Sequence, residues 1–153
     1  MMTAGRIPVV GAVVVVAAVV VTLGGRPSVA ATQARTVWDG VYTAEQAARG
    51  APLYAWSCAE CHGSDLTGGE MAPGLAGSEF AWNWNGLSVG DLFERVRISM
   101  PQGVPGSVSR QEKADILAFM FARSGFPAGE TELASRTAML AGISVLAEAP
   151  TPR

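Results

Sequence analysis

The chain has 153 residues, of which 49% are hydrophobic, and a formal net charge of −2. This length suggests a single domain. Residues 1–31 carry two of the 11 basic residues and no acidic one, so nine basic residues remain against 13 acidic ones, which argues against a nucleic-acid partner.

The N-terminal residues are typical of an export signal. Arg6 precedes an uncharged apolar run, residues 7–23, and the small residues Ala30 and Ala31 follow at a favourable cleavage point. The alternative is a retained membrane anchor, because the run reaches the shortest length that can span a bilayer. Either way, residues 1–31 predict a periplasmic or otherwise exported protein, possibly anchored to the outer face of the cytoplasmic membrane.

Residues 32–42 form an irregular lead-in, and a helix is expected to begin after them. Thr43 can cap its N-terminus, with Gln46 completing a capping box. Apolar residues then recur on one helical face as far as Cys58. Pro52 lacks an N–H group and clashes with the preceding turn, which predicts a kink or a restart of the helix there.

Two further helices are predicted between long loops. Residues 63–86 are rich in glycine and show little periodicity, so we expect an ordered loop. A capping box at Ser88 and Asp91 predicts a helix that ends before Pro101, because the residue before a proline avoids helical geometry.

The third helix follows a second loop, residues 99–108. Ser109 and Glu112 form the clearest capping box in the chain, and the helix should end at Gly125. Residues 43–127 would then be the folded domain, with a possibly helical C-terminal extension at 128–153. The expected fold class is therefore all-α, with helices too short to bury much apolar surface without a shared apolar guest.

The residues that carry chemistry lie at the end of the first helix. Cys58 and Cys61 are the only cysteines and His62 is the only histidine, and together they form the C-x-x-C-H signature of haem attachment. Two thiols one helical turn apart can each form a thioether with one haem vinyl group. The imidazole that follows can then coordinate the iron.

Three alternatives to haem attachment were weighed. A structural zinc site needs about four ligands, and no second Cys or His pair exists. A thioredoxin-like redox pair needs a βαβ context, which the helical pattern does not offer. A chance pair of buried cysteines is the third, and a disulfide across so short a loop would stabilise little.

A second axial ligand would have to be a methionine, since one histidine cannot supply both. Met120 and Met139 lie among apolar residues of expected helices and are predicted to pack in the core. Met100 lies in a loop bounded by proline and glycine and is the favoured ligand. Met71, only nine residues after His62, remains the alternative.

At these residues the sequence resembles the class I c-type cytochromes with one haem, and among them the small cytochromes associated with bacterial quinoprotein dehydrogenases. The matching segments are QAARGAPLYAWSCAECHG, MAPGLAGSEFAWNW, RISMPQGVPGSVS and KADILAFMFARSGFPAG. They extend over roughly residues 38–133. The resemblance implies a small cytochrome c fold of three to five helices around one covalent haem c.

The resemblance also implies roles for individual residues. Gly50 and Tyr54 should pack against the last helix around Leu117 and Phe121. The carbonyl of Pro73 should accept a hydrogen bond from His62, and Met100 should be the sixth ligand. Trp82 and Trp84 lie where such proteins close over a haem propionate, or they simply pack around the haem.

The expected function is one-electron transfer without acid–base catalysis. The cofactor-binding residues would be Cys58, Cys61, His62, Met100 and Pro73, with His62 and Met100 on the metal. Partners would be redox proteins, a dehydrogenase as donor and a cytochrome or oxidase as acceptor, with a membrane involved only if residues 1–31 are retained. The rival interpretations are a haem enzyme or gas sensor with an open sixth position, and a haem-free interaction module held by zinc or a disulfide.

Overall fold

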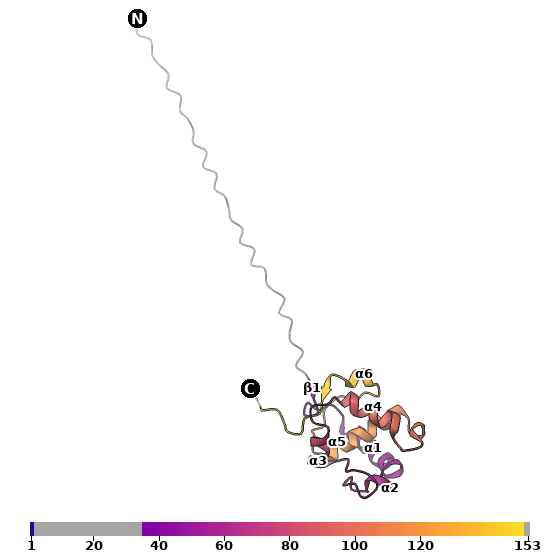
Figure 1. Ribbon diagram of the computed structural model, residues 1–153. Coiled ribbons are helices and arrows are strands. Elements are labelled where there is room, and N and C mark those ends of the chain that lie inside the picture. The colour runs from indigo at the N-terminus through magenta and orange to yellow at the C-terminus, as the bar shows by residue number, and fades with distance from the viewer. Residues whose placement is uncertain (2–34, 152–153) are drawn as a thin grey trace. The chain divides into compact units, whose positions relative to one another are not determined.

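The computed structural model describes residue 1 and residues 35–151 (Figure 1). Apart from Met1, the predicted export segment lies outside the described residues, so its cleavage or retention stays a prediction. Within the described residues, no helix combines the length and the apolar character needed to cross a bilayer.

The described part of the chain is helical, which confirms the expected fold class. Its helices are α1 (Ala44–Ser57), α2 (Ala59–His62), α3 (Gly77–Asn83), α4 (Val89–Ser99), the 3₁₀ helix η1 (Pro105–Ser107), α5 (Arg110–Arg123) and α6 (Thr137–Leu140). Two strands of two residues each, β1 (Arg35–Thr36) and β2 (Ile143–Ser144), pair in parallel with Arg35 opposite Ile143.

Helix starts follow the predicted capping residues, with one exception. Complete capping boxes are present at Ser88, before α4, and at Ser109, before α5. At α1 the Thr43 side chain accepts from the Gln46 N–H. The side chain of Gln46 does not return to Thr43, because it is fully buried and bonded to both backbone groups of Leu133, so this capping box is only half formed.

Helices α1 and α5 cross at the centre of the domain (Figure 1), which is the crossing of first and last helices that the resemblance implies. A Cβ atom built on Gly50 would lie 1.9 Å from the Asp115 carbonyl oxygen, so only glycine allows this approach. The Tyr54 ring packs 5.5 Å from that of Phe119. The closest contact is therefore at Asp115, before the expected position around Leu117 and Phe121.

Pro52 does not interrupt α1, so the predicted restart is wrong. Both Pro52 and Ala48, whose carbonyl loses its usual partner, are exposed on the solvent side of the helix. Water can therefore satisfy the freed carbonyl, and packing on α5 holds both halves of the helix in place.

The stretch 63–86, expected to be loop throughout, contains α3. Phe80 anchors this helix with 1% of its surface exposed, whereas Trp82 faces outward. Too few apolar residues fall inside seven positions to produce a clear helical period, which explains why the pattern was missed.

Residues before and after the predicted 43–127 domain also contribute to its core. In the lead-in Val37 is fully buried, and the Trp38 indole Nε1 donates to the Leu146 carbonyl at 2.9 Å. In the extension Leu140 and Val145 are buried. Helix is limited there to the single turn of α6, so the extension is mostly irregular chain that packs through scattered apolar residues.

Candidate functional site

The C-x-x-C-H motif lies at the junction of two helices. Cys58 ends α1 and precedes α2, and its carbonyl accepts hydrogen bonds from the N–H groups of Cys61 at 3.2 Å and His62 at 3.0 Å. This turn brings both cysteines and the histidine onto four residues of backbone. Cys58 is half-buried and Cys61 is exposed, and neither forms a disulfide.

His62 is oriented by the loop that follows it. Its Nδ1 lies 2.8 Å from the Pro73 carbonyl oxygen, which is the hydrogen bond that the resemblance implies. Because a carbonyl can only accept, Nδ1 carries the proton and Nε2 is left with its lone pair. The imidazole is thus held in the tautomer that binds a metal through Nε2.

Nε2 is also accessible. His62 as a whole is only 8% exposed. Within the described chain Nε2 makes no hydrogen bond, yet no fully buried side-chain nitrogen or oxygen there lacks a partner. Nε2 therefore reaches accessible space from an otherwise buried ring, as a ligand to a guest group must.

The loop between His62 and Pro73 closes because of Gly68. This residue has φ +78°, and a Cβ on it would lie 2.4 Å from the Gly74 nitrogen. Glycine is required on both counts. At the start of the loop the Tyr54 hydroxyl donates to the Gly63 carbonyl at 2.7 Å. Burial raises the pKa of Tyr54 to about 12, so the donor keeps its proton under physiological conditions.

Met100 approaches the motif from the other side of the fold. It follows the last residue of α4 and lines one apolar cavity together with Cys58. The other lining residues are Val96, Pro101, Val108, Lys113 and Ile116. At about 20 Å³ the cavity is too small to enclose a macrocycle, so it defines an apolar wall shared by the first cysteine and the favoured sixth ligand.

The remaining methionines differ in their surroundings. Met71 is 82% exposed, and Met120 is buried at 2%, as predicted for a core residue. Met139 is 58% exposed, so its predicted place in the core is wrong. In the single turn of α6 it is the neighbouring Leu140 that is buried, and Met139 is left in solvent.

The electrostatics around Cys58 favour a neutral sulfur atom. Burial raises the pKa of the Cys58 thiol to about 11, which disfavours the thiolate that a zinc site requires. A thioether sulfur is uncharged and suits this apolar wall. Within the described residues no three His, Cys, Asp or Glu side chains come together as a metal cluster.

The aromatic residues near the glycine loop divide into two environments. Trp84 is partly buried against the core, whereas Trp82 is 58% exposed. Trp56, two residues before the motif, is 91% exposed. The sequence pattern had not singled out Trp56, because nothing in the helical period distinguishes an exposed tryptophan from a packed one.

Sequence reasoning also missed Lys113. Its ammonium lies in the wall beside Cys58 and Met100, and its burial lowers its pKa, helped by the nearby Arg97 and Arg110. A lysine in the first turn of a predicted helix is normally solvated, so no sequence pattern pointed to it.

The fold and the site define a small helical domain whose residues fit a covalently held haem: two cysteines one turn apart, an oriented imidazole and a methionine sulfur. The sequence model of the family described as "Cytochrome C oxidase, cbb3-type, subunit III" matches residues 45–120, from the first turn of α1 to the last turn of α5. The chain is therefore a c-type cytochrome, a class that implies covalent haem c and redox partners. No curated protein and no solved structure matches the chain.

Proposed function

We propose that this chain is an exported mono-haem cytochrome that carries single electrons between a dehydrogenase and a downstream cytochrome or oxidase. The observation that carries the proposal is the pairing of two sides. His62 is held with Nε2 free on one side, and Met100 shares an apolar wall with Cys58 on the other.

Each site residue has one task. Cys58 and Cys61 provide the covalent attachment, His62 Nε2 and the Met100 sulfur are the axial ligands, and the Pro73 carbonyl fixes the imidazole. A bound haem supplies iron that exchanges one electron between its ferrous and ferric states. A methionine opposite a histidine raises the reduction potential of such a centre.

The two axial residues also distinguish a carrier from an enzyme. When protein side chains occupy both axial positions, no coordination site remains for oxygen or peroxide. The rival function, a haem enzyme or gas sensor, requires Met100 to lie off the iron. Its place in the same wall as Cys58 favours the carrier.

The replacement Met100→Ala tests this assignment in the purified exported protein. We expect the ferric protein to lose the weak sulfur-to-iron charge-transfer band, the reduced protein to bind CO readily, and the potential to fall. Met71→Ala is the matched control, because Met71 is 82% exposed and should change none of these. An unchanged Met100→Ala spectrum would refute the ligand assignment, and an altered Met71→Ala spectrum would move it to Met71.

The redox partners follow from the family and the resemblance. The description of the matched family names an oxidase subunit, which supports an oxidase at the accepting end, and the resemblance to cytochromes of quinoprotein dehydrogenases supports such an enzyme as donor. Stopped-flow mixing of the oxidised protein with a reduced quinoprotein dehydrogenase, and of the reduced protein with a cbb3-type oxidase, tests each end. Rates that do not depend on cytochrome concentration would remove that partner.

A further inference from the structure

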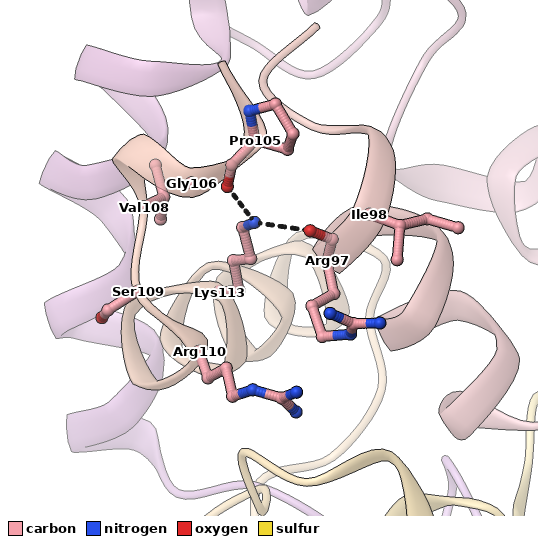
Figure 2. Close-up of a pocket in the computed structure, with 8 residues that line it drawn as sticks. All are labelled: Arg97, Ile98, Pro105, Gly106, Val108, Ser109, Arg110 and Lys113. Atoms are coloured by element: carbon pink, nitrogen blue, oxygen red, sulfur yellow. Dashed lines mark hydrogen bonds between the residues drawn. The ribbon is translucent and has the colours of Figure 1, made fainter. Parts of the chain in front are cut away.

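Lys113 is an unusual residue for the interior of this domain. Its side chain is 2% exposed, and its Nζ donates to two backbone carbonyls, that of Arg97 at 3.1 Å and that of Pro105 at 2.6 Å (Figure 2). The guanidinium groups of Arg97 and Arg110 lie nearby in a cavity of about 540 Å³ that Lys113 also lines. No acidic residue lines this cavity.

The two carbonyls bracket the Met100 loop. Arg97 lies in the last turn of α4, three residues before Met100, and Pro105 begins η1, five residues after it. Within the described chain, the other hydrogen bonds of residues 98–108 are local, such as that from the Met100 N–H to Val96. Lys113 thus ties both ends of the loop to α5.

Apolar packing holds this loop only weakly. Ile98 and Val104, the large apolar residues on either side of Met100, are 56% and 58% exposed. Their side chains contribute little of the burial that normally fixes a segment. The loop that carries the favoured sixth ligand therefore depends on its polar tie to α5.

Electrostatics indicate that Lys113 serves the loop and not its own helix. A cation in the first turn of α5 faces the positive end of that helix's dipole, which is unfavourable. The same cation lies at the carbonyl end of α4, where a positive charge is favourable. Burying an ammonium among neutral carbonyls is costly, and an apolar side chain would fill the space with less desolvation.

Lys113 also reaches the ligand side of the site directly. It lines the same apolar wall as Met100 and Cys58. A change in its position would therefore be felt where the methionine sulfur and the first cysteine come together.

We infer that Lys113 is a positioning residue for Met100, a buried clamp that holds both ends of the ligand loop. The inference rests on the proposed function, in which Met100 is an axial ligand. The clamp keeps the sulfur at the iron, and without it the loop opens while the rest of the domain stays folded.

The test compares Lys113→Met with Lys113→Arg in the purified haem-containing protein. Lys113→Met keeps most of the side-chain volume and removes both hydrogen bonds, whereas an arginine can donate to both carbonyls. Arg110→Met is the matched control, because Arg110 is an exposed cation of the same helix. The readouts are the charge-transfer band during heating, CO binding to the reduced protein, and helix unfolding by circular dichroism.

For Lys113→Met we expect the fraction of molecules with an open sixth position to rise about tenfold or more, as the loss of two bonds to a charged group predicts. The band should then disappear well below the temperature at which the helices unfold. Lys113→Arg should restore most of the wild-type behaviour, and Arg110→Met should resemble wild type.

Two results would overturn the clamp. One is wild-type CO binding and band in Lys113→Met, and the other is loss of band and helix together, which indicates a structural role alone. If Lys113→Met does not fold, Lys113→Gln gives the same comparison with a shorter donor. Failure of the proposed function is separate, because Met100→Ala would then leave band and CO binding unchanged in the wild-type background.

Discussion

Replacement of Gly50 by alanine adds one methyl group where α1 and α5 are closest. The added Cβ would lie 1.9 Å from the Asp115 carbonyl oxygen and 2.5 Å from its carbonyl carbon. Real Cβ atoms essentially never approach closer than 3.0 Å, so the helices must separate by about 1 Å. Both contacting atoms belong to the backbone, and no side chain can rotate away to relieve them.

The expected effect is the balance of two opposing terms. Alanine stabilises a helix by about 1 kcal/mol relative to glycine. Overpacking of a tight contact costs about 1–3 kcal/mol, and the upper end applies because the backbone itself must move. The net destabilisation is then about 2 kcal/mol, which lowers the melting temperature by about 8 °C for a domain of this size.

Thermal unfolding of the ferric protein, followed by far-ultraviolet circular dichroism, measures this shift. Gly142→Ala is the control, since no atom lies within 4 Å of a Cβ at Gly142 and its φ is not positive. The control should change the unfolding free energy by less than about 0.5 kcal/mol. A Gly50→Ala protein that melts at or above the wild-type temperature would refute the contact between the two central helices.

Other substitutions test the polar core and the attachment. Gln46→Leu should destabilise the protein by about 3 kcal/mol in urea unfolding, because both backbone groups of Leu133 lose their buried partner; a loss below about 1 kcal/mol would contradict this. Burial raises the pKa of Tyr54 from 10.0 to about 12, so the stability that it contributes is complete below pH 10 and is lost as pH rises towards 12. Tyr54→Phe should therefore unfold with less pH dependence than wild type above pH 10, and parallel pH profiles would exclude this role. The double replacement of Cys58 and Cys61 by serine should abolish covalent haem and most helicity, and retained circular dichroism in the haem-free protein would refute the second part.

Local sequence rules predicted the fold where one side chain settles a local choice. The starts of α4 and α5 follow from Ser88 and Ser109, each with an acidic residue three positions later. Pro101 sets the end of α4. These features depend only on neighbours along the chain, which the sequence displays directly.

The sequence was less informative where distant segments decide the outcome. Gln46 leaves its capping box because Leu133 offers a buried partner 87 residues away. Pro52 stays inside α1 because its freed carbonyl faces water while the other face packs on α5. The apolar spacing around Met139 resembles a helix, yet the extension is fixed by separate contacts and forms a single turn.

The candidate site divides in the same way. Cys58, Cys61 and His62 are adjacent, so their spacing alone predicts their chemistry. Pro73 entered through the resemblance, and its hydrogen bond to His62 is present in the structure. Lys113 could not be predicted, because its role depends on two backbone carbonyls contributed by another helix and a loop.

The central claim is that one haem is covalently attached to Cys58 and Cys61 of the exported chain. An intact mass of the protein purified from a host competent in cytochrome maturation tests it most directly. The account predicts the mass of the chain plus one haem, retained under denaturing conditions, and the same spectrum reports whether residues 1–31 are removed. A mass equal to that of the unmodified polypeptide would contradict the account.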